Sequence, residues 1–140
     1  MDFSCGPAGY SSVSSYLIVD EARDTIDLLS AVFHAVEFRH VELGNGKLRH
    51  AELRVDDTTI MLADTPESSP SVPAHVHVSV SDVDATSQRT LQAGAPAHAP
   101  HTPGSRAKVS ASRRLISSGI MLSCLRGGNR QAGAKRVGPY

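Results

Sequence analysis

One order of local features occurs twice in this chain of 140 residues. Residues 13–19 (VSSYLIV) and 74–80 (AHVHVSV) both alternate between apolar and other side chains, as half-buried strands do. In each case acidic residues follow the strand, and then a stretch compatible with a helix ends in small residues. Aligning Glu21 with Asp82 brings the two copies into one register. The chain therefore contains an internal repeat of one supersecondary unit.

The first copy continues into three further strands. Asp20 is placed to cap the helix. Residues 36–43 and 47–55 alternate on either side of a Gly-Asn-Gly turn, which predicts a hairpin, and residues 58–63 predict another strand. The apolar residues at helical spacing, which should face the core, are Ala22, Ile26, Leu29 and Phe33. The first unit is therefore predicted to have the order βαβββ.

The second copy follows a linker rich in Pro and Ser at residues 64–73, and it is incomplete. Its helix is predicted over residues 82–92, with Gly94 placed for a C-terminal cap. If the two copies matched, three strands would follow Ala95, but prolines interrupt that part of the chain. Only residues 115–125 are apolar enough for a late strand. The second unit is therefore predicted to be atypical at its C-terminal end.

The zero net charge hides an asymmetry along the chain. Residues 1–100 contain 6 Lys/Arg and all 14 Asp/Glu, whereas residues 101–140 contain 8 Lys/Arg and no acidic residue. The basic segment has no interleaved aromatic residues, so we expect neither a specific nucleic-acid partner nor a membrane partner. The chain also has no apolar run of about 18 residues and no secretory signal, so we expect it to be cytoplasmic. Cys5 and Cys124 lack the spacing of a metal or redox motif.

Several segments in the right order resemble the PhnB-like glyoxalase/bleomycin-resistance proteins of the vicinal oxygen chelate superfamily. In the first unit these are S-Y-L-I-V-D-E-A, V-F-H-A, G-K-L-R-H-A-E-L-R-V-D-D and T-I-M-L-A-D. In the second unit they are H-V-H-V-S-V-S-D-V-D-A and the A-G-A stop. The resemblance covers roughly residues 10–95.

The resemblance implies an α+β fold of paired βαβββ modules, whose curled mixed sheet surrounds a concave pocket. It also implies a small-molecule ligand and a homodimer partner that completes the pocket. In metal-using members, the first and last strands of each module supply ligands. Those positions fall on Ser14, near Met61 and on His75, and the fourth lies in the atypical segment, where His98 and His101 are the nearby candidates. Since only His75 is a good ligand type, we expect no cofactor, and the alternative is a zinc, nickel, iron or manganese ion at His75.

The residues predicted to line the ligand pocket are Ser14, Tyr16, His75 and His77. Tyr16 offers a ring for stacking and a hydroxyl for one hydrogen bond, with core packing as the alternative. His75 and His77 share one strand face, so they supply two metal ligands or an acid/base pair, or they line a pocket without metal. His50 and Glu52 share a face of another strand, and we interpret them as a solvated surface, with a catalytic role as the alternative.

Three functions remain open on the sequence. The single good metal ligand favours a protein that binds a small molecule without transforming it. The first alternative is a metal-dependent lyase, transferase or dioxygenase, in which the ion polarises vicinal oxygens of the substrate. The second alternative is an inactive product with a frame-shifted C-terminus. The codons of residues 116–121 (ISSGIM), read one nucleotide earlier, can encode Asp-(Leu or Phe)-Phe-Gly-His-Asn, close to the family pattern Asp-Pro-Phe-Gly-His.

The pattern also predicts how the chain is divided. The predicted parts are a flexible arm at residues 1–12, a first module at 13–63, the linker at 64–73, a second module at 74–125 and a basic mobile tail at 126–140. The frame shift would lie between Ala95 and Lys108. No catalytic residue and no particular ligand follow from the sequence.

Overall fold

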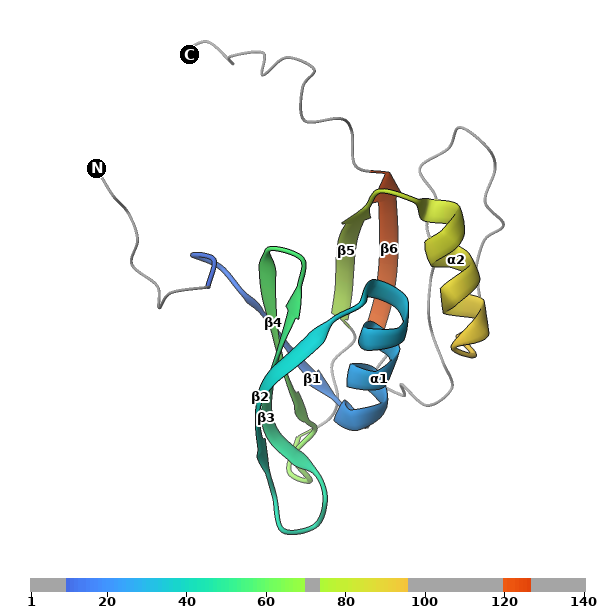
Figure 1. Ribbon diagram of the computed structural model, residues 1–140. Helices are drawn as coiled ribbons and strands as arrows, with labels where there is room; N and C mark the ends of the chain where they lie inside the picture. Colours follow the sequence, from blue (N-terminus) through green and yellow to red (C-terminus); the bar gives the residue numbers. More distant parts are fainter. Residues whose placement is uncertain (1–9, 70–73, 96–119, 127–140) are drawn as a thin grey trace, which may run out of the picture.

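The computed structural model describes residues 10–69, 74–95 and 120–126 of the chain (Figure 1). The elements in chain order are β1 (Ser15–Val19), α1 (Ala22–Phe33), β2 (Val36–Glu42), β3 (Leu48–Val55), β4 (Thr58–Asp64), β5 (Ala74–Val80), α2 (Val83–Gln92) and β6 (Ile120–Arg126). Most of the predicted arm and of the basic tail lies outside the described residues.

The first five elements form the predicted βαβββ module. Its sheet has the strand order β1-β4-β3-β2, in which β1 and β4 are parallel and the other pairs are antiparallel. The α+β architecture with a curled mixed sheet is therefore confirmed. The predicted Gly-Asn-Gly turn connects β2 to β3, and Gly46 adopts a φ of 80°, a conformation that glycine tolerates without steric cost.

The second module repeats the parallel pairing of the first one. β5 pairs with β6 in parallel, from Ala74 opposite Ile120 to Val80 opposite Arg126. Thus β6 takes the place in the second module that β4 takes in the first. It falls in the later part of the predicted strand at residues 115–125, and residues 96–119 lie outside the described part of the chain.

Helix α1 lies against one face of the first sheet (Figure 1), and its apolar residues share a core cluster with residues of that sheet. Ala22, Ile26 and Leu29 of the predicted stripe are buried, and Phe33 is half-buried between the two clusters of the core. The sheet residues of the main cluster include Leu17, Val19, Leu53, Ile60 and Leu62. Val76 and Val78 of β5 pack against the same cluster but are only half-buried, less than the alternation predicts.

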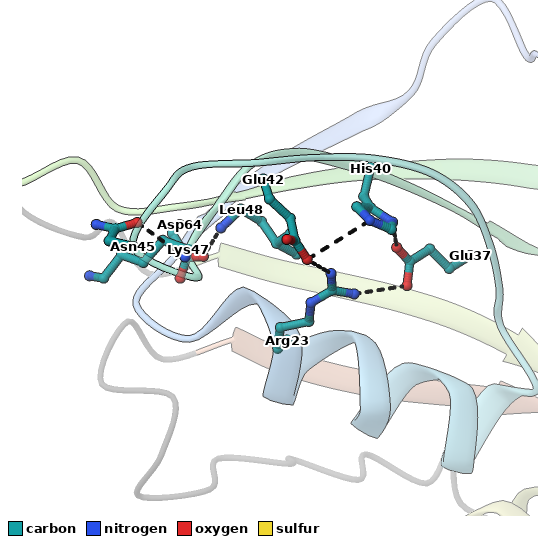
Figure 2. A network of polar contacts seen from close by, with 8 residues as sticks. All are labelled: Arg23, Glu37, His40, Glu42, Asn45, Lys47, Leu48 and Asp64. Carbon is teal, nitrogen blue, oxygen red and sulfur yellow. Dashed lines mark hydrogen bonds and ion pairs between the residues drawn. The ribbon is translucent and has the colours of Figure 1, made fainter.

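The N-terminus of α1 is held by a residue far away in the sequence. The prediction that Asp20 caps this helix is wrong, because the cap residue is Glu21, which makes no capping hydrogen bond with its side chain. Instead, Asp64 at the end of β4 accepts a hydrogen bond from Ala22 N at 3.0 Å. Its other oxygen accepts one from Leu48 N at 2.6 Å, which Figure 2 shows. One carboxylate thus joins α1, β3 and β4.

The ends of α2 agree with the sequence. Asp82 is the N-cap, and its side chain accepts a hydrogen bond from Ala85 N at 2.9 Å. Gly94 follows the helix with a φ of 79°. The residue that follows α1 is His34, which takes a similar left-handed conformation with a φ of 57°. No helix among the described residues is both long and apolar enough to cross a membrane.

Replacing Asp64 with Ala should destabilise the first module. The change leaves Ala22 N–H and Leu48 N–H without their acceptor, so we expect the free energy of unfolding to fall by about 2 to 4 kcal/mol. Asp64→Asn keeps one carbonyl oxygen and should lose about half as much. Urea denaturation measures both, with Asp27→Ala on the exposed face of α1 as the control, expected within about 0.5 kcal/mol of wild type. Equal stability of Asp64→Ala and wild type would contradict this role.

Candidate functional site

The face of the first sheet opposite α1, called here the open face, contains one row of side chains that crosses all four strands. Tyr16 of β1 lies opposite Met61 of β4, Met61 lies opposite Glu52 of β3, and Glu52 lies opposite Arg39 of β2. His50 and Arg54 flank Glu52 on the same face, because side chains of a strand alternate. This row unites residues that are far apart in the sequence.

Glu52 is the centre of the row, and it is buried although it lies on the open face. The residue is 4% exposed. One carboxylate oxygen accepts a hydrogen bond from the Tyr10 hydroxyl. The other lies 2.9 Å from His50 Nε2 and 3.8 Å from a guanidinium nitrogen of Arg39. These partners replace the water molecules that a carboxylate loses when it is buried.

These contacts shift the pKa of both Glu52 and Tyr10. The hydrogen bond from Tyr10 lowers the pKa of Glu52, and the contacts with His50 and Arg39 lower it further against the effect of burial. The same hydrogen bond raises the pKa of Tyr10, since removing its proton would place a second anion beside Glu52. Glu52 is therefore the anion and Tyr10 the donor at neutral pH.

Aromatic rings surround this carboxylate. The Tyr16 ring stacks on the His50 ring with 5.7 Å between centroids and 25° between planes. Phe38 meets Tyr10 edge to face at 6.2 Å, and the Arg54 guanidinium lies 6.0 Å from the centre of the Phe38 ring. Tyr16 is 50% exposed and Phe38 is 46% exposed, so both rings can contact another molecule.

An irregularity of β2 brings Phe38 and Arg39 onto the open face together. The strand register shifts between Glu37 and Arg39, so Phe38 is an extra residue opposite β3. Without that shift, neighbouring side chains would point to opposite faces. The β2 side of the open face therefore presents a ring and a guanidinium next to each other.

A second polar network lies on the other side of β2 and faces α1 (Figure 2). Arg23 of α1 contacts Glu37 and Glu42, and His40 Nδ1 lies 2.6 Å from a carboxylate oxygen of Glu37. The side chains of Arg23, His40 and Glu42 are at least two-fifths exposed, so this network fastens β2 to the helix at the surface.

The interpretation of His50 and Glu52 as a solvated surface is wrong for Glu52. Alternation correctly places both on one face, but it does not reveal that Tyr10 and Arg39 cover the carboxylate. Tyr10, Arg39 and Phe38 are functional candidates that the sequence reasoning missed. The sequence shows an acidic residue inside a predicted strand, a pattern equally typical of a solvated hairpin, so no local signal indicated these candidates.

The four predicted pocket residues do not form one cluster within the described part of the chain. Tyr16 lies in the open-face row, and Ser14 precedes β1 in a half-buried position. His75 and His77 lie on the exposed face of β5, opposite the half-buried valines. His77 also lines a groove of about 800 Å³ between the two modules, together with Ser15, Ile60, Asp82 and Arg89. Their shared role in one pocket stays a prediction.

The residues at the predicted metal positions offer few donor atoms that suit a metal ion. Ser14 and Met61 offer a hydroxyl and a thioether, and His75 offers an imidazole. Mn(II), zinc and iron are bound by imidazole and carboxylate groups, usually three or more. Within residues 10–69, 74–95 and 120–126, no group of three His, Cys, Asp or Glu side chains could hold a metal ion. The described donors therefore do not fit a catalytic metal.

No protein-family model matches the chain. An uncharacterized protein of Mycobacterium bovis and one of Mycobacterium tuberculosis (strain CDC 1551) are each 41% identical to it over 95 residues, which is 60% of this chain. The match covers 62% and 56% of their lengths, respectively. The chain thus spans about three-fifths of the length of the curated relatives it matches.

Solved structures share the fold at low sequence identity. The fosfomycin resistance protein FosX of Mesorhizobium loti has a TM-score of 0.63 at 16% identity, covering 84% of this chain and 92% of its own. TioX of Micromonospora sp. ML1 has a TM-score of 0.63 at 23% identity, with coverages of 83% and 98%. FosX of Listeria monocytogenes, in complex with Mn(II) and 1S,2S-dihydroxypropylphosphonic acid, has a TM-score of 0.61 at 16% identity, with coverages of 84% and 91%.

These similarities bear on the predicted family. The solved structures share the curled α+β architecture of this chain, so the predicted fold class is confirmed. The narrower assignment to PhnB-like proteins stays a prediction.

Removing the Tyr10 hydroxyl should change the titration of Glu52. We expect Tyr10→Phe to raise the pKa of Glu52 toward its ordinary value of 4.5, because this hydrogen bond is the largest cause of the lowering. Carbon-detected NMR of the Glu52 carboxyl group measures the pKa. Ser11→Ala, which removes a nearby exposed hydroxyl, is the matched control and should leave the pKa unchanged.

The same pKa sets a dependence of stability on pH. A carboxyl group whose pKa is lower in the folded than in the unfolded protein stabilises the fold at any pH above its unfolded-state pKa. This stabilisation is lost as the pH falls through the folded-state pKa. The stability difference between wild type and Glu52→Gln should therefore be largest at neutral pH and shrink below pH 4.5. Urea denaturation at several pH values measures it, and a difference independent of pH would contradict the assignment.

Proposed function

We propose that this protein binds a small organic molecule on the open face, in a pocket that a second copy of the chain completes. One observation supports this most: a buried, ionised Glu52 organises polar groups in the middle of a face whose aromatic rings are half exposed. Ligand sites combine apolar and aromatic walls with a few fixed polar groups in this way. An ordinary solvated sheet face has no reason to bury a carboxylate.

The Glu52 network would also prepare the site before a ligand arrives. Tyr10 and His50 are held by the same carboxylate, so their polar groups lose little freedom when a ligand binds, and Arg39 forms a longer ion pair with it. Such preorganisation raises affinity by lowering the entropic cost of binding. The open face therefore presents recognition groups from β1, β2 and β3 and from the segment that precedes β1.

The role of the second copy follows from the orientation of the two modules. The open face is opposite α1, and the exposed face of β5 is opposite the half-buried valines that pack against the core. In the homodimer that the resemblance implies, His75 and His77 of a second copy's β5 would close the pocket over Tyr16. The four predicted pocket residues would then act together across the interface.

Binding on the open face can be tested with a neutral aromatic probe, 4-biphenylmethanol. We expect it to shift the ring NMR signals of Tyr16 and His50, because the exposed ring offers a stacking surface. Tyr16→Ala should weaken binding about tenfold. Leu91→Ala, at an exposed apolar residue of α2, is the matched control and should have no effect. Absence of any shift at Tyr16 and His50 would contradict the proposal.

The alternative function is a metal-dependent enzyme, and the Mn(II) complex of a FosX structure with the same fold favours testing it. We expect purified protein incubated with Mn(II) or zinc to retain far less than one equivalent per chain, because His75 is the single good donor at the predicted positions. Elemental analysis after dialysis measures the metal content. If the protein retains one equivalent of metal per chain and His75→Ala loses it, the proposal of ligand binding without catalysis is wrong and the metal-dependent enzyme is favoured.

A further inference from the structure

The ligand class follows from the open face itself. We propose that the ligand is an elongated aromatic anion, whose rings lie near Tyr16 and whose anionic group meets Arg39. This inference rests on the proposed function, since it assigns the chemistry of the same site. Three features of the face support it: its charge, the pairing of rings with guanidinium groups, and the length of the row.

The charges that the open face presents to solvent are positive, although the surrounding module is acidic. The side chain of Arg39 is 65% exposed, whereas that of Glu52 is 5% exposed. Glu52 already accepts from Tyr10 and His50. The carboxylate that the described part of this face contributes is thus occupied, while the Arg39 side chain is mostly exposed. An anion is attracted to such a face, and an ammonium group is repelled by it.

The guanidinium of Arg39 is suited to one kind of anion. It has five N–H donors in a planar fork that binds a carboxylate, phosphonate or sulfonate through two parallel hydrogen bonds. Its contact with Glu52 is an ion pair at 3.8 Å, beyond hydrogen-bonding distance, so these donors are available to a ligand. The bulge in β2 places Phe38 next to Arg39 on the open face, and the Phe38 ring lies 6.0 Å from the guanidinium of Arg54.

The row also sets the length of the ligand. Tyr16 and Arg39 are separated by three strand spacings, which is about 14 Å between their backbones. The Arg39 side chain can reach several ångströms back toward the centre. A single ring with an acid group is too short to reach both ends, whereas two linked rings with an acid group, about 10 Å long, span the row over Met61 and Glu52.

Four probes test charge and length separately. These are biphenyl-4-carboxylate, the neutral 4-biphenylmethanol, the cationic 4-biphenylmethylamine and the single-ring benzoate. We expect the biphenyl carboxylate to bind the full chain at least about tenfold more tightly than the alcohol, and benzoate to bind at least about tenfold more weakly than the biphenyl carboxylate. The amine should bind most weakly of the three biphenyls. NMR titration of the Tyr16 and His50 signals measures each dissociation constant.

Substitutions of Arg39 test the proposed anion contact. Arg39→Gln should reduce the affinity for the carboxylate at least about tenfold, and far more than it reduces the affinity for the neutral alcohol. Arg39→Lys keeps the charge but not the fork, so its affinity for the carboxylate should lie between those of wild type and Arg39→Gln. Arg49→Gln, at an exposed arginine of β3 that is not part of the open-face row, is the matched control for general charge and should have no effect.

The outcomes separate this inference from the proposed function. If the amine or the alcohol binds at Tyr16 as tightly as the carboxylate, the aromatic anion is wrong and the binding function stands. Equal losses for carboxylate and alcohol in Arg39→Gln would also overturn the anion contact. If no probe, including the neutral alcohol, perturbs Tyr16 or His50, the proposed function itself is wrong.

Discussion

The carboxylate of Asp64 is the contact on which the first module depends. Parallel strands cannot be joined by a tight turn, so β1 and β4 meet only after the chain has passed through α1 and the β2–β3 hairpin. The Asp64 carboxylate holds these segments together, because it accepts hydrogen bonds from Ala22 N at the start of α1 and from Leu48 N at the start of β3. Directly after it, Thr65 N donates to Val19 O at the end of β1. The two ends of the module are thereby fixed to its middle.

The register that follows from this closure creates the open-face row. A shift of one residue in any strand would turn Tyr16, Met61 or Glu52 toward the core and expose buried apolar residues. The burial of Leu17, Leu53 and Leu62 therefore holds the functional candidates on the opposite face. Core packing and site geometry are two results of the same strand pairing.

The buried carboxylate of Glu52 fixes the positions of the groups around it, because its burial is unfavourable without them. Burial of an unpaired carboxylate would be strongly unfavourable, and its partners offset that cost only when all of them are in place. The network joins Tyr10, 42 positions away in the sequence, to β2 and β3. Such a network contributes more to the uniqueness of the local structure than to its overall stability. Its natural consequence is a face with fixed donors and rings.

Features that depend on neighbouring residues could be predicted from the amino-acid sequence. The alternation of residues 74–80, the Asp82 cap, the glycine turn at Gly46 and the repeat of strand and helix are local patterns, and each is present in the structure. That Asp64 binds the first backbone amide of α1, and that Glu52 is covered and not solvated, became visible only in the folded chain. The physical reason is that both carboxylates bind partners 42 residues away, which strand pairing brings together and no local pattern encodes.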